Sequence, residues 1–238
     1  MRRMGHELVS YNEGGHSFEA FVARPSGPGP HPAVMICHAW GGRDAFVEAK
    51  ATKLAELGYI GVAIDLYGDG KRGHDTASSQ ALMMPLLNDP ALLRGRLALS
   101  FETVRGLTGV DRSKIATIGF CFGGLCSLLT ARMGLEQLGA VSFHGILKIG
   151  EKLETKPKAR ILVLHGQDDP MAPPADVGAF AEEMKRINAT WTLEAYAGVQ
   201  HAFTNPAAND GELGLFYNAQ ADLRSWTAMT RFLGDLFG

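Results

Sequence analysis

The chain has little cysteine. Three cysteines are present in 238 residues, and no two of them form a C-x-x-C pair. Small secreted domains that depend on disulfides, and zinc sites built on cysteine pairs, need more than this. The cysteine content therefore indicates a protein of the reducing cytoplasm. Arg2 and Arg3 are not followed by the apolar segment of a signal peptide, which agrees with that expectation.

Long apolar runs and clusters of one charge are also missing. No apolar run approaches the roughly 20 residues of a membrane-spanning helix. Lys and Arg together number 23 against 25 Asp and Glu, a formal net charge of −2, and no basic cluster exceeds two residues. Binding to nucleic acid requires a basic patch. We therefore expect neither a membrane nor a nucleic acid as a partner, and we expect a monomer or a homodimer.

The chain is instead rich in apolar residues, which make up 46% of it. This content and a length of 238 residues predict a single α/β domain over residues 1–238. The Pro/Gly-rich stretch at 25–30 resembles a linker. However, the two dozen residues before it cannot bury a core of their own, so a surface turn between strands is the better interpretation.

The pattern of apolar residues predicts strands that alternate with helices. Such an order is typical of a mostly parallel sheet with helices on both faces, here with an antiparallel hairpin at the N-terminus. Functional sites of these sheets form at the carboxyl ends of the strands. The predicted strands are 6–11, 16–23, 33–37, 59–65, 115–118, 140–143, 160–165 and 191–196, and the predicted helices are 43–57, 76–107 with a break near 88–90, 177–187 and 217–237.

The segment Gly119-Phe120-Cys121-Phe122-Gly123 lies between a predicted strand and a predicted helix. A sharp strand-to-helix turn needs glycine on both sides of its central residue, because a side chain there collides with neighbouring backbone. The free N–H groups and the dipole of the helix favour a thiolate at its start. We interpret Cys121 as a nucleophile; the alternative is a small buried hydrophobic residue in a glycine-rich turn.

An acid and a histidine follow the ends of two later strands. Asp168 and Asp169 come after the strand at 160–165, and His201 lies in the loop after the strand at 191–196. The chain order of nucleophile, acid and histidine is that of α/β-hydrolases. We predict His201 as the base, whereas His144 and His165 are expected to be structural residues with a fixed tautomer.

Two backbone N–H groups are predicted to form an oxyanion hole. One belongs to Phe122, directly after the nucleophile, and the other belongs to the loop after the strand at 33–37. In His38-Ala39-Trp40-Gly41-Gly42 the predicted donor is Ala39.

These residues resemble the dienelactone hydrolase family. The resemblance covers nearly the whole chain and is strongest in the segments 119–124, 165–169 and 196–203. It implies an α/β-hydrolase fold, hydrolysis of small esters and lactones without a metal or an organic cofactor, and a triad of Cys121, Asp169 and His201. The Gly-x-x-Asp spacing from Gly166 is the reason to prefer Asp169 over Asp168.

Two positions depart from the family's pattern. His38 takes the place of a glutamate that holds the resting thiol, and Asn205 takes the place of an arginine that binds the substrate carboxylate. The residues expected at the mouth are mostly apolar or adaptable, which favours an uncharged or aromatic ester, with Arg43 or Arg72 as the remaining sources of a cation. His38 is interpreted either as a group that tunes Cys121 or as a residue lining the mouth. The predicted substrate contacts are His38, Trp40, Tyr67 and Phe203, with Met83, Met84 and Phe122 also near the mouth.

The sequence thus predicts a cysteine-dependent hydrolase of small esters or lactones that acts through a thioester on Cys121. One alternative is a promiscuous hydrolase of aryl esters, thioesters or activated phosphoesters. A second alternative, from another class of protein, is a non-catalytic ligand-binding protein with the same fold. A redox sensor, in which Cys126 or Cys37 resolves an oxidised Cys121, is the third possibility.

Overall fold

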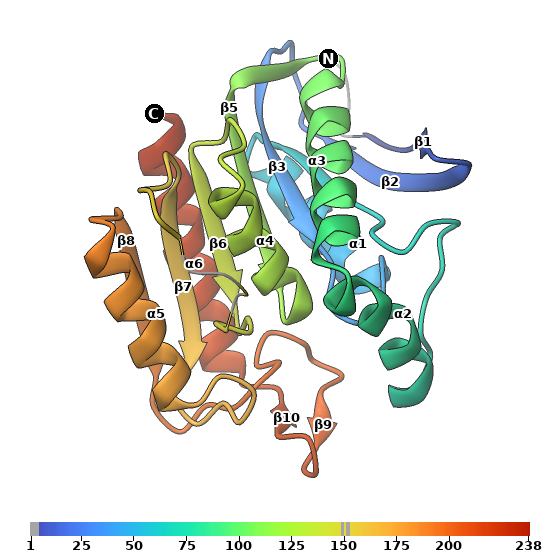
Figure 1. The fold of residues 1–238 in the computed structure, drawn as a ribbon. Coiled ribbons are helices and arrows are strands. Elements are labelled where there is room, and N and C mark those ends of the chain that lie inside the picture. The colour runs from blue at the N-terminus through green and yellow to red at the C-terminus, as the bar shows by residue number, and fades with distance from the viewer. Residues whose placement is uncertain (1–4, 149, 151–152) are drawn as a thin grey trace.

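The computed structural model describes residues 5–148, 150 and 153–238, which form a mostly parallel sheet between helices (Figure 1). Arg2 and Arg3, used above to predict that no signal peptide is present, lie outside the described residues. The strand order is β1-β2-β4-β3-β5-β6-β7-β8. The strands are β1 (Gly5–Glu13), β2 (His16–Arg24), β3 (His31–Cys37), β4 (Ile60–Ala63), β5 (Val110–Phe120), β6 (Gly139–Phe143), β7 (Arg160–Gly166) and β8 (Trp191–Tyr196).

The predicted N-terminal hairpin is confirmed. β1 and β2 pair antiparallel, and β2 in turn pairs antiparallel with β4, so the hairpin extends one edge of the sheet. From β4 to β8 all neighbouring strands are parallel. Their carboxyl ends therefore lie at one edge of the sheet, where the predicted site residues follow them.

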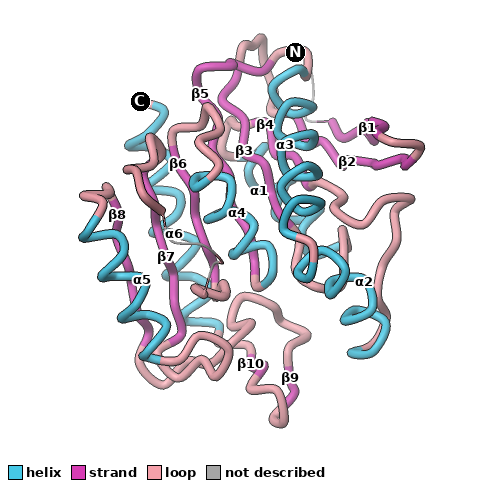
Figure 2. The backbone as a smooth tube through the Cα atoms, in the orientation of Figure 1, coloured by secondary structure: helices cyan, strands magenta, loops and turns pink. Residues whose placement is uncertain are grey.

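Helices cover both faces of the sheet (Figure 2). One face is covered by α1 and α6 and the other by α3, α4 and α5, as the buried clusters show. Neighbouring residues of β3 alternate between the two layers: Val34 and Ile36 pack with α1 and α6, whereas Met35 packs with α3 and α4. The helices are α1 (Ala45–Glu56), α2 (Thr76–Asn88), α3 (Pro90–Gly106), α4 (Phe122–Arg132), α5 (Pro174–Arg186) and α6 (Ala219–Phe237).

The predicted break near residues 88–90 is confirmed, and its cause is local. Asp89 caps α3 by accepting a hydrogen bond from the Leu92 N–H at 3.0 Å. Pro90 is the first residue of α3, where its missing N–H costs nothing. The chain therefore ends α2 at Asn88 and begins a new helix at once.

β4 ends earlier than predicted, at Ala63 rather than at residue 65. The side chain of Asp65 accepts hydrogen bonds from the N–H groups of Tyr67 and Gly68, both at 2.9 Å, and of Gly70, at 3.1 Å. An aspartate that binds the following backbone in this way turns the chain away from a strand. The segment after β4 is therefore fixed over the edge of the sheet.

A short hairpin that the sequence pattern did not predict lies beyond the carboxyl ends of the strands. It consists of β9 (Asn209–Asp210) and β10 (Leu215–Phe216), which pair antiparallel. Figure 1 shows it below the sheet, on the side where β7 ends. His201 pairs with Leu215 as an isolated bridge, which ties the hairpin to the predicted base. None of the helices in the described part of the chain has the length and apolar character needed to cross a bilayer.

Candidate active site

Cys121 lies at the turn between β5 and α4, as the glycine pattern predicted. Its backbone has φ 56° and ψ −118°, a conformation that is strained for a non-glycine residue. The turn is held in place by the Cys121 N–H, which donates to the carbonyl of Phe143 at 3.0 Å and to Nδ1 of His144 at 3.1 Å. The side chain of Cys121 is partly buried and lies at the N-terminus of α4.

The glycines on both sides of Cys121 have no room for a side chain. A Cβ on Gly119 would lie 1.8 Å from the carbonyl oxygen of Gly123, and a Cβ on Gly123 would lie 2.1 Å from the carbonyl oxygen of Cys37. The obstacles are backbone atoms in both cases, so a side-chain movement cannot relieve the collision. The close approach of Gly123 to Cys37 also brings the start of α4 against the end of β3.

We expect Gly119→Ala to lower the free energy of unfolding by more than about 4 kcal/mol, because the new methyl group must displace backbone in the core. Gly95→Ala is the control: Gly95 lies in the exposed part of α3 with nothing near its Cβ, so this change is expected to raise stability by up to about 1 kcal/mol. Urea unfolding of both variants gives the comparison. Wild-type stability in Gly119→Ala would contradict the geometry of the turn.

His201 and Asp169 form a buried pair next to this turn. Nδ1 of His201 and Oδ2 of Asp169 are 2.7 Å apart, and both side chains are fully buried. The other oxygen of Asp169 accepts a hydrogen bond from the Met171 N–H at 2.8 Å. The carboxylate is therefore fixed from both sides, and it directs Nε2 of His201 away from Asp169.

Nε2 of His201 is buried and has no hydrogen-bond partner among the described residues. Burial lowers the pKa of His201, but Cys121 and Asp169 together outweigh it and raise this pKa to about 10. Among the groups that raise this pKa Cys121 comes first, which places its sulfur near the imidazole. The arrangement favours a protonated imidazole next to Cys121 at neutral pH.

The two predicted oxyanion-hole donors are free to bind. Within the described residues, neither the Phe122 N–H nor the Ala39 N–H donates a hydrogen bond to the protein. Phe122 is the first residue of α4, and Ala39 lies in the loop after β3. Because Gly123 packs against the backbone of Cys37 and His38, the two loops lie side by side.

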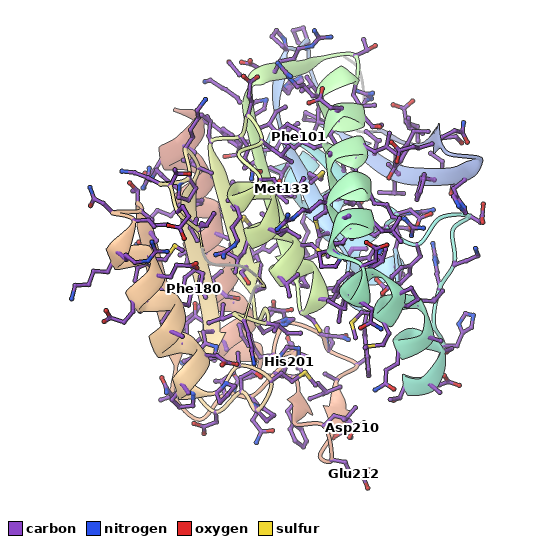
Figure 3. All side chains as sticks on the ribbon, viewed as in Figure 1. Phe101, Met133, Phe180, His201, Asp210 and Glu212 are labelled. Atoms are coloured by element: carbon purple, nitrogen blue, oxygen red, sulfur yellow. The ribbon has the colours of Figure 1, made fainter. Side chains whose placement is uncertain are left out.

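A cavity of about 360 Å³ opens beside the turn that carries Cys121. Cys121, His201 and Ala39 lie in its wall, together with the predicted contacts Trp40 and Met83. Asn205, at the position where the family resemblance implies an arginine, also lies in the wall. Figure 3 shows His201 at this lower edge of the sheet, far from the buried Phe101 and from Met133. The further wall residues are Asp44, Phe46, Gln80, Phe120, His144, Ile146, Met171, Ala202, Ala207, Ala208, Asn209, Asp210, Leu213 and Leu215.

The predicted role of His38 is corrected by its hydrogen bonds. Its Nδ1 lies 2.6 Å from the carbonyl of Ala39, and its Nε2 accepts from the Leu66 N–H at 3.1 Å. Both ring nitrogens are thus occupied by backbone, and burial lowers the pKa of His38. The ring is not part of the cavity wall among the described residues. His38 therefore fixes the loop that carries Ala39, instead of contacting the thiol or a substrate.

Tyr67 and Phe203 also support the site from behind. The Tyr67 hydroxyl donates to the carbonyl of Trp40 at 2.6 Å, and the Tyr67 ring stacks on Phe122 with centroids 6.4 Å apart. Phe203 is fully buried and meets the His144 ring edge-on at 5.0 Å. Neither residue lines the cavity in the described part of the chain, which corrects their prediction as substrate contacts; the same holds for Met84 and Phe122.

Neither arginine considered for the substrate supplies a cation to the cavity. Arg43 is buried and pairs with Glu48 and, at 2.6 Å, with Glu19. Arg72 pairs with the same Glu48 at 3.1 Å. The charges of both side chains are therefore already compensated outside the cavity wall.

His144, predicted from the sequence as a structural residue, also lies in the site. Because its Nδ1 accepts from the Cys121 N–H, the proton lies on Nε2, which donates to the Thr204 hydroxyl at 2.8 Å. The ring meets that of His201 edge-on at 5.2 Å and lines the cavity. Its position in the sequence is typical of a site residue, because His144 follows the end of β6 just as Cys121 follows β5.

Burial, and secondarily His201, hold the pKa of His144 well below its usual value. Below about pH 6.5 the unfolded chain takes up a proton on this residue that the folded chain does not, so stability falls as the pH falls, by up to about 1.4 kcal/mol per unit. We expect the free energy of unfolding, measured with urea at pH 7, 6 and 5, to depend less on pH in His144→Asn than in wild type. Asparagine does not titrate and tolerates the φ of 39° at this position. The same pH dependence of the free energy of unfolding in both proteins would contradict this prediction.

The other two cysteines are fully buried and free. Burial raises the pKa of both the Cys37 and the Cys126 thiol. A protonated, inaccessible thiol is a poor partner for disulfide exchange. Among the described residues, no group of three or more His, Cys, Asp or Glu side chains is arranged to hold a metal ion.

Known proteins resemble this chain over most of its length. The model of the "Dienelactone hydrolase family" matches residues 18–237. A solved structure described as a dienelactone hydrolase-like promiscuous phosphotriesterase, P91, from metagenomic libraries has a TM-score of 0.90 and 31% identity, covering 99% of both chains. A probable 2-oxo-3-(5-oxofuran-2-ylidene)propanoate lactonase of Bradyrhizobium sp is 26% identical, and the match covers 83% of each chain.

A putative carboxymethylenebutenolidase of Yersinia pestis is similar over 90% of this chain and 82% of its own length, at 25% identity. The family model spans the segments that carry Cys121, Asp169 and His201. The fold is the α/β-hydrolase fold of these neighbours. The chain belongs to the dienelactone hydrolase family.

Proposed function

We propose that this protein is a cysteine-dependent hydrolase of small esters or lactones that acts through a thioester on Cys121. One observation carries the proposal. Cys121 and His201 line the same cavity, and His201 is held by Asp169 with its free Nε2 on the side of the sulfur. A nucleophile, a base and an acid that orients the base are the elements of acyl transfer.

In the first half of the proposed reaction, the Cys121 sulfur attacks the ester carbonyl carbon and the carbonyl π electrons move to the oxygen. The N–H groups of Phe122 and Ala39 bind this oxyanion, and each donor contributes on the order of 3 kcal/mol to lowering the barrier. Collapse breaks the carbon–oxygen bond to the leaving group, which takes the proton from Nε2 of His201. The products are an alcohol or enol and a thioester.

In the second half, a water molecule gives a proton to Nε2 of His201 and attacks the thioester carbon. The oxyanion forms on the same two N–H groups. Collapse breaks the carbon–sulfur bond and releases the carboxylic acid and the Cys121 thiolate. Thiolate leaves readily and is a soft nucleophile, so aryl esters, enol-lactones and other activated esters suit this site better than amides.

A promiscuous hydrolase of aryl esters, thioesters and activated phosphoesters is the second candidate. It is favoured by the 31% identical structure described as a promiscuous phosphotriesterase. The same cysteine would attack phosphorus, and the same N–H groups would bind the phosphoryl oxygen. The two candidates differ in whether the intermediate on Cys121 is an acyl or a phosphoryl group.

The proposal is tested by trapping the intermediate. Wild type mixed with p-nitrophenyl acetate and quenched in acid at early times is expected to carry one acetyl group on the peptide that contains Cys121, as measured by mass spectrometry. The buried Cys37 and Cys126 are internal controls that should stay unmodified. Turnover of the ester with no acetyl on Cys121 at any time, at a rate that Cys121→Ala retains, would overturn the thioester. Binding of the ester without turnover would favour a ligand-binding protein, and a Cys121 disulfide after mild peroxide would favour a redox sensor.

A further inference from the structure

The charged side chains in the cavity wall are unbalanced. Apart from the proposed Cys121 and His201 pair, whose charges cancel, two carboxylates line the wall: Asp44 and Asp210. No Lys or Arg of the described residues lines it. The cavity therefore presents negative charge to whatever enters.

Each of the two carboxylates has one oxygen without a partner. Oδ1 of Asp44 caps α1 through the Val47 N–H at 3.2 Å, and Oδ1 of Asp210 accepts from the N–H groups of Glu212 and Leu213 at 3.0 and 3.1 Å. In the described part of the chain neither Oδ2 accepts a hydrogen bond, and neither residue forms an ion pair. Backbone thus orients both carboxylates and leaves an oxygen of each available.

Lys50, Arg43 and Arg72 are each paired with a carboxylate. Lys50 lies behind the wall, with Nζ 5.0 Å from the ring centroid of Phe46 and 5.6 Å from that of Phe120, and it pairs with Asp222 at 3.3 Å. Arg43 and Arg72 are paired with glutamates, as described above. Each of these cations thus has a carboxylate partner, and none of them lies in the cavity wall among the described residues.

Trp40 adds an aromatic surface to the same wall. Among the described residues its ring contacts no other ring and no cation, whereas Phe46 and Phe120 already face Lys50. Tryptophan is the aromatic side chain that binds cations best. Its carbonyl is held by Tyr67, so the segment that carries it is fixed.

The two carboxylates come from distant segments that meet at the site. Asp44 precedes α1, and Asp210 belongs to the β9–β10 hairpin beyond the carboxyl ends of the strands. Figure 3 shows Asp210 below His201, between His201 and Glu212 at the tip of the hairpin. An ester whose carbonyl reaches Cys121 therefore lies in the same cavity as both carboxylates.

We propose that the cavity selects its ester by charge, and that its preferred substrates carry a quaternary or protonated ammonium group. The inference rests on the proposed hydrolase function and adds the substrate class. The Asp44 and Asp210 carboxylates attract the cation, and the Trp40 ring supplies a surface for it. Esters that bear a carboxylate are disfavoured by the same two groups.

The test uses three p-nitrophenyl esters with the same leaving group. The cationic ester is the 4-(trimethylammonio)butanoate, the neutral ester of the same shape is the 5,5-dimethylhexanoate, and the anionic ester is the monoester of glutaric acid. Initial rates of p-nitrophenolate release, corrected for spontaneous hydrolysis, give kcat/KM for each. We expect the cationic ester to exceed the neutral one by on the order of tenfold, and the neutral one to exceed the anionic one similarly.

Variants identify the source of the preference. Asp44→Asn together with Asp210→Asn keeps the helix cap and the turn, and it is expected to bring the cationic-to-neutral ratio within about twofold of unity. Glu136→Gln, an exposed change before the amino end of β6, removes a charge far from the cavity and should leave the ratio as in wild type. Added salt should reduce the ratio in wild type.

The outcomes separate the two proposals. Equal kcat/KM for all three esters, or a ratio that the double variant does not change, overturns charge selection and leaves the hydrolase intact. A preference for the anionic ester also overturns it. If wild type hydrolyses none of the three esters above background, the proposed hydrolase function falls, and this inference falls with it.

Discussion

Cys121→Ala is expected to lower kcat/KM for a short-chain p-nitrophenyl ester by at least about a thousandfold. The sulfur at this position is the proposed nucleophile, and removal of the nucleophile from a catalytic triad costs up to about a millionfold. The measurement is p-nitrophenolate release by wild type and variant side by side. The fold should tolerate the change, because the variant keeps both flanking glycines and the backbone N–H of residue 121.

Cys126→Ala is the matched control for this experiment. Cys126 lies five residues further along α4, is fully buried, and faces the apolar cluster instead of the cavity. It should lose some stability, since a buried side chain is shortened, but retain the ester activity. Equal rates in wild type and Cys121→Ala, or no activity in either, would contradict the proposed triad. Either result would favour a ligand-binding protein or a redox sensor.

Asp169→Asn is expected to lower kcat/KM by about a thousandfold or more. The Met171 N–H needs an acceptor, so the amide oxygen of the substituted side chain takes that place and its NH2 group faces Nδ1 of His201. His201 must then carry its proton on Nε2 as the neutral tautomer. A carboxylate-to-amide change of this kind in serine proteases costs about ten thousandfold for the same reason.

The change also removes one of the two groups that raise the pKa of His201. With the pKa lowered, less imidazolium is present at pH 7, so alkylation of Cys121 by iodoacetamide at this pH is expected to slow in parallel. Asp168→Asn is the control, because Asp168 is exposed and next to the proposed acid. If Asp168→Asn instead lost the activity and Asp169→Asn kept it, the assignment of the acid would be reversed.

The sequence alone was sufficient for the turn that carries Cys121 and for the order of strands and helices along the chain. Both depend on local pattern: the glycines at 119 and 123 are needed because backbone comes within about 2 Å of where a Cβ would be, and continuous apolar runs predict strands buried on both faces. The break before Pro90 and the end of α1 are local as well. The pairing of Asp169 with His201 followed from their positions at strand ends and from the family resemblance.

The roles of single side chains around the cavity were decided only by tertiary structure. His38 and Tyr67 follow strands β3 and β4, as a substrate contact would, but their polar atoms are occupied by the Leu66 N–H and the Trp40 carbonyl from the neighbouring segment. No sequence pattern predicted the position of Asp210, because the two-residue hairpin strand that carries it is too short to form a periodic pattern. Sequence spacing determines where a strand ends, whereas packing between distant segments determines which way each side chain there points. The order of the proposed catalytic residues could therefore be read from the sequence, but the charge of the cavity could not.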